Sequence, residues 1–135
     1  MPSICIAFCW EKAGEKYNIE PELLLAIAYV ESGLNYKAYG RNKNGSYDIG
    51  LMQINSSHLK WLKRKNITED ELISDPCLNV MTGASILAGF IQQAGYNWHS
   101  IGAYNAGLSM KRENARKRYA EKVWGKYEEI ITSSP

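Results

Sequence analysis

The chain has 135 residues and a mass of 15.3 kDa, a length typical of one domain. Hydrophobic residues make up 45% and charged residues 22%, which excludes a disordered chain, because that class is poorer in apolar residues and more lopsided in charge. The net charge of +2 is too small for the field by which nucleic-acid-binding proteins neutralise phosphates, and no apolar run reaches the roughly 20 residues of a membrane-spanning helix.

The first eight residues are predicted to be a signal remnant or a flexible N-terminus, with an ordinary first helical turn as the alternative. The segment from Ile4 to Trp10 is apolar, but it is too short for a signal peptide and lacks a basic start. We therefore place a single domain at residues 9–135. Three cysteines are too few to decide the redox compartment by their number alone.

Helical signals are clear from residue 21 onward. Pro21 suits the first turn of a helix, Leu23 and Ile27 then recur at helical spacing, and Gly33 is a plausible end. Residues 34–50 are rich in Asn, Gly, Tyr and Lys, which predicts a long loop or a small irregular hairpin with a turn at Asn44-Gly45.

Further helices are predicted along the rest of the chain. Thr68 and Glu71 have the spacing of a capping box, and Asp75-Pro76 is typical of a helix start. The expected helices follow Asn55, begin near Thr68, and run over 76–94, 98–104 and about 111–131. The fold class is therefore all-α, mostly helical, with a small irregular β-like loop near residues 36–50.

Glu31 is the first candidate for chemistry. It lies at the C-terminal end of the apolar helix over 21–32. Apolar surroundings and the negative end of the helix dipole both disfavour the carboxylate, so each raises its pKa. A raised pKa suits a general acid that works near neutral pH. The alternative is an ordinary surface Glu that ends a helix.

Four motifs follow one another along the chain. They are Glu31-Ser32, the stretch Gly50-Leu51-Met52-Gln53-Ile54-Asn55, the stretch Ala103-Tyr104-Asn105-Ala106-Gly107, and the stretch Arg118-Tyr119-Ala120-Glu121-Lys122-Val123. In this order they resemble the lytic transglycosylases of the goose-type lysozyme superfamily, over about residues 9–123. More narrowly, Cys9-Trp10, Asp75-Pro76-Cys77 and Gly102 to Gly107 resemble the invasion-associated transglycosylases of bacterial type III secretion systems.

The resemblance implies a lysozyme-like helical fold with a peptidoglycan groove. Glu31 then corresponds to the acid that protonates the glycosidic oxygen between N-acetylmuramic acid and N-acetylglucosamine. The family motifs place substrate-binding residues at Ser32, at Gly50, Met52 and Gln53, which line the groove, at Tyr104 and Asn105 beside the acid, and at Tyr119. The product would be a 1,6-anhydro sugar formed without water.

Asp48 is a second candidate carboxylate, 17 residues after Glu31. Chicken-type lysozymes pair a Glu acid and an Asp at the same separation, where the Asp stabilises or attacks the oxocarbenium centre. The alternative is an Asp that caps a turn in a loop rich in Gly and Asn.

The resemblance also implies a disulfide between Cys9 and Cys77, which an enzyme outside the cytoplasm permits. Cys5 would then be left without a disulfide partner within the chain. His58 and His99 are too few and too scattered for a zinc cluster, so we expect no metal and no cofactor.

Two basic clusters and three tryptophans have open interpretations. The clusters, Lys60 to Lys65 and Lys111 to Arg118, are typical of solvated helix faces, but they would also attract the carboxylates of peptidoglycan peptides or an acidic partner. Trp61, Trp98 and Trp124 are expected to anchor the core, with stacking on a sugar as the alternative.

Three functions remain in view. The leading one is a periplasmic lytic transglycosylase that opens the cell wall for a secretion apparatus, with peptidoglycan as substrate and an apparatus component, such as an inner-rod protein, as a candidate partner. The others are a lysozyme-type hydrolase that uses Asp48 and water, and a non-catalytic docking module, which has no need of an acid at Glu31.

Overall fold

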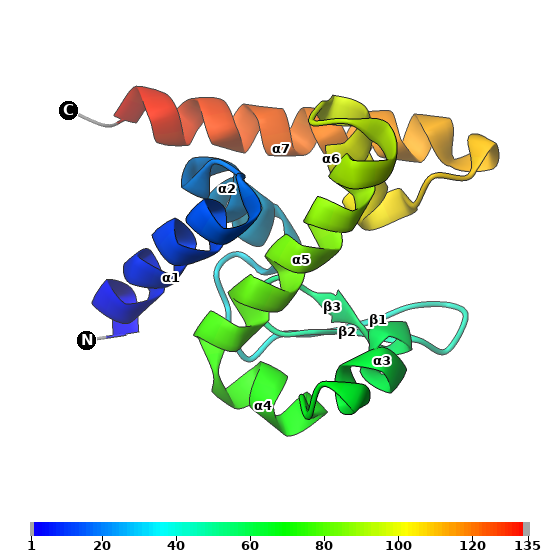
Figure 1. Cartoon of the computed structure of the whole chain (residues 1–135). Helices are drawn as coiled ribbons and strands as arrows, with labels where there is room; N and C mark the ends of the chain where they lie inside the picture. The colour runs from blue at the N-terminus through cyan, green and yellow to red at the C-terminus, as the bar shows by residue number, and fades with distance from the viewer. Residues whose placement is uncertain (1, 134–135) are drawn as a thin grey trace.

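The computed structural model describes the backbone of residues 2–133 and the side chains of residues 9–133. The expectations for residues 1–8 and for Cys5 therefore lie outside the described side chains. In chain order the elements are α1 (Pro2–Tyr17), α2 (Pro21–Ser32), β1 (Tyr39–Arg41), β2 (Tyr47–Ile49), β3 (Ile54–Asn55), the 3-10 turn η1 (Ser56–His58), α3 (Leu59–Arg64), α4 (Glu69–Ser74), α5 (Pro76–Ala94), α6 (Trp98–Ala106), the 3-10 turn η2 (Met110–Arg112) and α7 (Glu113–Ser133) (Figure 1).

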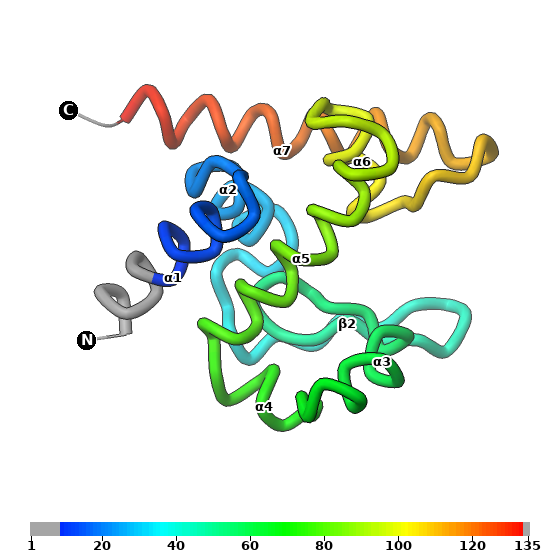
Figure 2. Tube along the Cα trace, viewed as in Figure 1, coloured from blue at the N-terminus to red at the C-terminus, as the bar shows by residue number. Residues whose placement is uncertain are grey.

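Helix α5 runs through the middle of the molecule and divides it into two parts (Figure 2). On one side, α7 lies across α2 and α6, and α1 packs against α2 and α5. On the other side lie the small sheet with α3 and α4, which contact α5 through α4 and β3. This mostly helical arrangement with one small sheet confirms the predicted fold class.

The helix ends form where the sequence places them. Pro21 stands in the first turn of α2, and Gly33 ends it in the left-handed conformation, with φ of 63°. Thr68 and Glu71 form both hydrogen bonds of the predicted capping box at the start of α4. The Asp75 side chain accepts a hydrogen bond from the backbone N–H of Leu78 and so caps α5.

The predicted irregular hairpin is part of a three-stranded antiparallel sheet, in the order β1-β2-β3. The β1–β2 connection turns at Gly45, with φ of 89°, as the Asn44-Gly45 pair predicts. Asp48 lies at the centre of β2, opposite Gly40 on one side and Asn55 on the other. Strand β3 has two residues and was not predicted, because so short a strand has no periodicity to detect.

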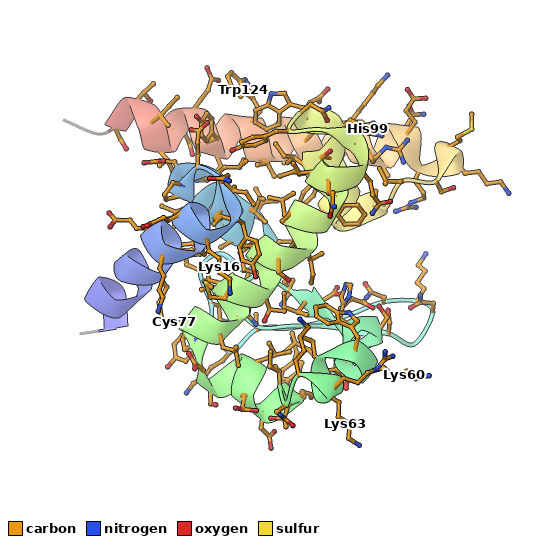
Figure 3. All side chains as sticks on the ribbon, in the orientation of Figure 1. Lys16, Lys60, Lys63, Cys77, His99 and Trp124 are labelled. Carbon is orange, nitrogen blue, oxygen red and sulfur yellow. A yellow bond between two sulfur atoms is a disulfide. The ribbon has the colours of Figure 1, made fainter. Side chains whose placement is uncertain are left out.

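The tryptophans correct one expectation. Trp98 and Trp124 do not anchor the core: they are 38% and 43% exposed, and their rings meet edge to face at the surface, 5.3 Å apart. Trp124, labelled in Figure 3, follows Val123, which takes the buried position on α7. Trp61 is half-buried and packs against the core, which also contains the buried Trp10.

The predicted disulfide is present between Cys9 of α1 and Cys77 of α5, with a Cα–Cα distance of 5.4 Å. It closes a loop over a sequence separation of 68. The bond fixes the N-terminal helix to the central helix.

Candidate active site

A cavity of about 510 Å³ lies between the sheet and the helices α5 and α6, and it reaches the end of α2. Both candidate carboxylates, Glu31 and Asp48, line it. The other lining residues are mostly polar: Asn42, Asn44, Ser46, Gln53, Ile54, Asn55, Ser57, His58, Ile86, Phe90, Ala103, Tyr104, Asn105, Gly107 and Arg112. The fold therefore gathers three of the four sequence motifs around one polar cavity, and the fourth contributes the Tyr119 contact to Glu31.

Glu31 sits half-buried in the last turn of α2, the apolar helix whose middle section, from Leu23 to Ala28, packs into the core. The pKa of its carboxyl group is raised to about 7: burial is the main cause, a hydrogen bond from Tyr119 lowers the pKa, and the negative charge of Asp48 raises it. The raised pKa predicted from the sequence is confirmed, with burial as its main cause. Near neutral pH a large fraction of Glu31 therefore carries a proton that it can donate.

Tyr119 is the side chain that holds this acid. Its hydroxyl donates a hydrogen bond of 2.7 Å to Oε2 of Glu31, and the ring is 6% exposed in the interface between α7 and α2. Burial and the neighbouring Glu31 raise the pKa of Tyr119 well above its usual value, so the hydroxyl remains a donor. The contact joins residues 88 positions apart, which explains why local sequence patterns gave no sign of its geometry.

Tyr104 lines the cavity together with Glu31 and also makes a structural contact. Its hydroxyl donates a hydrogen bond of 2.7 Å to the carbonyl oxygen of Met52, so it fastens α6 to the chain that follows β2. Asn105, the next residue, is exposed and lines the cavity. Asn105 therefore remains a candidate for contact with substrate.

Asp48 is held by two side-chain amides that the sequence analysis did not single out. Nδ2 of Asn55 donates to Oδ1 of Asp48 at 2.8 Å, and Nδ2 of Asn42 donates to Oδ2 at 3.2 Å. Both amides also donate to Oγ of Ser46, at 3.1 Å each. With both oxygens engaged, the Asp48 carboxylate has a fixed orientation. The amide-rich sequence on both sides of Asp48 was the available signal.

The stretch from Gly50 to Gln53 requires a correction. Gln53 lines the cavity, whereas the Met52 side chain is fully buried and packs against Gly83, so the expected sugar contact by Met52 is wrong. Gly50 is also buried. Its positive φ of 74° bends the chain inward, and a Cβ atom there would lie 2.4 Å from the amide nitrogen of Asn79.

Asn79 explains why this stretch is buried. It is completely inaccessible to solvent, its Oδ1 accepts from the backbone N–H of Met52 at 2.7 Å, and its Nδ2 donates to the carbonyls of Ile49 and Leu72. One side chain of α5 thus ties the sheet to α4. Asn79 was missed because a single Asn on an apolar helix face has no distinguishing pattern.

Ser32 also supports the site from behind. Its Oγ is 2.7 Å from the carbonyl oxygen of Leu51 and 3.2 Å from that of Ala28, so its hydroxyl links the end of α2 to the connection between β2 and β3. It does not line the cavity. The geometry points to a role in placing Glu31 rather than in contact with substrate.

No metal site is evident in the part of the chain whose side chains are described, since no group of three or more His, Cys, Asp or Glu residues there is placed to hold an ion. Nδ1 of His58 accepts a hydrogen bond of 2.9 Å from Trp61. Two carboxyl groups in different environments, Glu31 and Asp48, line the cavity. A pair of this kind suits cleavage of a glycosidic bond.

Comparison with protein families identifies the chain. The protein-family model described as "Transglycosylase SLT domain" matches residues 8–126 of the chain. The chain belongs to the SLT transglycosylase family. Membership makes it an enzyme of the lytic transglycosylase class that acts on peptidoglycan, a substrate that lies outside the cytoplasm. None of the helices formed by residues 2–133 combines the length and apolar character that crossing a bilayer requires.

Other members of the family are similar over most of their length. The chain is 52% identical over 124 residues to invasion protein IagB of Salmonella typhimurium, covering 92% of this chain and 78% of that protein. It is 46% identical over 134 residues to protein IpgF of Shigella flexneri, covering 99% of this chain and 88% of that protein.

A solved structure shows the same fold. The lytic transglycosylase Slt of Pseudomonas aeruginosa, in an inactive mutant, superimposes with a TM-score of 0.70 at 20% identity. The match covers 93% of this chain but 24% of that one, so the SLT transglycosylase described here corresponds to about a quarter of the larger protein. The lysozyme-like transglycosylase fold implied by the sequence motifs is confirmed.

Proposed function

We propose that this SLT transglycosylase cleaves the β-1,4 bond between N-acetylmuramic acid (MurNAc) and N-acetylglucosamine (GlcNAc) with Glu31 as its acid and base, and leaves 1,6-anhydro-MurNAc ends. The observation that carries the proposal is the half-buried Glu31 carboxyl group, with its pKa raised to about 7, in the wall of a polar cavity. Such a group is protonated often enough to act as an acid and basic enough to take the proton back.

The reaction needs one proton to move twice. Glu31 donates its proton to the glycosidic oxygen, the bond to the anomeric carbon breaks, and GlcNAc leaves with a free hydroxyl. The MurNAc O6 hydroxyl then attacks the anomeric carbon and gives its proton to the Glu31 carboxylate, which restores the acid. The Tyr119 hydrogen bond keeps the carboxyl group in one orientation through both steps.

Asp48 supplies the negative charge that the intermediate stage requires. Positive charge develops on the anomeric carbon as the bond breaks, and Asp48 lines the same cavity as Glu31. The hydrogen bonds from Asn42 and Asn55 fix the direction of its carboxylate. Preorganised charge of this kind acts mainly on the transition state. Of the proposed substrate contacts, Gln53, Asn105 and Tyr104 are those that line the cavity.

A hydrolase that uses Asp48 and water is the second candidate, favoured by the same fixed carboxylate. The non-catalytic docking module does not fit a chain that belongs to an enzyme family. Relatives named for invasion support a further proposal for this chain: it works in the periplasm and opens the wall locally for a secretion apparatus, with an inner-rod protein as a candidate partner.

The test is clearing of purified peptidoglycan sacculi by the wild type and by Glu31→Gln. The amide keeps the shape but has no proton to give, so we expect clearing to fall by about 10²–10⁴-fold. Glu22→Gln is the matched control, because it replaces a carboxyl group with an amide on the same helix, at an exposed position in the first turn. Clearing by Glu31→Gln at the wild-type rate would refute the role of Glu31.

A further inference from the structure

Four aromatic side chains gather at the surface where α6 packs against α7: Tyr96, Trp98, Trp124 and Tyr127. The rings of Trp98, Trp124 and Tyr127 have their centroids 5.3 to 6.4 Å apart. None of the four side chains lines the active-site cavity. We call this group the aromatic surface, and the reaction described above does not account for its exposed rings.

A cavity lies on each side of the two tryptophans, which line both cavities. The larger, of about 480 Å³, extends along α7 to Glu113, and the smaller, of about 350 Å³, reaches the residue before α2, Glu20. Neither shares a lining residue with the active-site cavity. In Figure 3, Trp124 and His99 mark this end of the molecule, and Lys60 and Lys63 mark the other end, on α3. The aromatic surface is therefore separate from the active site.

Hydrogen bonds hold the two tyrosines of the aromatic surface in place. The hydroxyl of Tyr127 donates to the carboxylate of Glu20, and the hydroxyl of Tyr96 accepts from the backbone N–H of Glu20 at 3.0 Å. Each ring is thus fixed at its polar end, while part of it stays exposed. Rings that are fixed in advance lose little conformational freedom when a ligand binds.

The exposed apolar area of this surface is aromatic rather than aliphatic. The aliphatic residues that line the two cavities, Leu23, Ile101 and Ala120, are buried. Beside the rings stands Glu121, which is exposed and forms no ion pair among the described side chains.

This combination of rings and carboxylates favours a sugar over a protein as the ligand. Carboxylates such as Glu121 are depleted from the cores of protein interfaces. A sugar, in contrast, can pack the C–H groups of its ring against an aromatic face and donate its hydroxyl protons to a carboxylate in charge-assisted hydrogen bonds. The sugar stacking that the sequence left open for Trp98 and Trp124 thus agrees with their exposed positions.

We propose that the aromatic surface binds glycan strands of peptidoglycan away from the bond being cleaved, and so keeps the enzyme attached to the cell wall between cleavages. The proposal rests on the substrate of the SLT transglycosylase family and is independent of the role of Glu31. A glycan strand repeats its sugars along its length, so both sites meet their ligand on the same material. Two contacts with one polymer raise the overall affinity without any change at the active site.

The experiment measures binding without cleavage, so every protein carries Glu31→Gln. Calorimetry uses soluble glycan strands from which an amidase has removed the stem peptides, at high salt, which screens exposed charges. The test variant adds Trp98→Leu and Trp124→Leu, which keep the side chains apolar but remove the rings. A second variant, with Trp98→Phe and Trp124→Phe, restores a ring at both positions. The control adds Tyr39→Leu, which removes a ring that is 52% exposed on β1 and lines neither cavity.

We expect the dissociation constant of the leucine variant to rise about tenfold, as for aromatic residues at the centre of a binding site. The phenylalanine variant should keep most of the parent affinity, and the Tyr39→Leu control all of it. Melting temperatures check the fold, and Trp124→Leu alone replaces the double variant if the latter unfolds early.

Parent affinity in the leucine variant would overturn the proposal, including the case in which the aromatic surface binds a protein. An equal loss in the leucine and phenylalanine variants would also overturn it, because binding would then not depend on an aromatic ring. Since no cleavage is measured, failure of the proposed reaction would show separately, in the clearing assay.

Discussion

At the scale of single residues, burial raises the pKa of Glu31 most, and two neighbours then act on it in opposite directions. The hydrogen bond from Tyr119 lowers that pKa and the charge of Asp48 raises it. A general acid is active in its protonated form, so the rate falls as pH rises through its pKa. Substitution of each neighbour should therefore shift the alkaline limb of the pH profile of kcat/KM, in a direction that shows how that neighbour acts on the pKa.

Tyr119→Phe removes the hydrogen bond that lowers the pKa of Glu31. We expect the alkaline limb to move to higher pH and kcat to fall several-fold, because the carboxyl group loses its fixed orientation. Tyr104→Phe is the control: it breaks the bond to the Met52 carbonyl and leaves the one to Glu31 intact, so its limb should stay in place. Equal profiles for Tyr119→Phe and the wild type would contradict the assigned role.

Asp48→Asn removes the charge that raises the pKa of Glu31, so here the alkaline limb should move to lower pH. We also expect kcat to fall by about 10-fold or more with little change in affinity for glycan, since the lost interaction belongs to the transition state. Melting temperature is measured on the same variant. A lower melting temperature with kcat intact would return Asp48 to the role of a turn cap.

At the scale of elements, the sequence predicts what is encoded locally. The ends of α2, α4 and α5 follow from Pro21, Gly33, the Thr68 capping box and Asp75, because each of these signals acts within one helical turn. The geometry of the site depends on contacts between distant segments, such as the hydrogen bond from Tyr119 to Glu31. No local sequence pattern reveals such contacts.

The stretch after β2 illustrates the limit. The motif predicts that Met52 contacts the substrate, whereas its side chain points into the core. Its backbone N–H is held by Asn79, 27 residues later, and no local pattern predicts that contact. The prediction that Trp98 and Trp124 anchor the core is wrong for a similar reason. Their size favours burial in general, but the direction in which each helix faces decides the outcome.

Asn79→Ala tests the connection between the sheet and the helices. The substitution leaves the Met52 N–H and the Ile49 and Leu72 carbonyls without their partner. We expect a loss of about 2–4 kcal/mol in the free energy of unfolding, from buried polar groups left unsatisfied, measured by urea denaturation. Asn114→Ala, at an exposed position on α7, should cost little. A similar small cost for both variants would contradict the structural role.

At the scale of the whole molecule, the Cys9–Cys77 bond fastens α1 to α5. The chain-entropy relation for a loop of this length predicts a contribution of about 4 kcal/mol to stability, so reduction, or Cys9→Ser with Cys77→Ser, should lower the melting temperature clearly. The site lies elsewhere, so kcat at a temperature well below melting should be unaffected. Equal melting temperatures for the oxidised and reduced proteins would show that the bond is dispensable.

The central claim is that Glu31 directs the MurNAc O6 hydroxyl, and not water, to the anomeric carbon. Mass spectrometry of the fragments released from purified peptidoglycan tests it directly, because a 1,6-anhydro end is one water molecule lighter than a reducing end. The account predicts that anhydro-MurNAc ends predominate in the wild-type digest and are missing from the Glu31→Gln digest. Reducing MurNAc ends in the wild-type digest would contradict it and identify a hydrolase that activates water opposite Asp48.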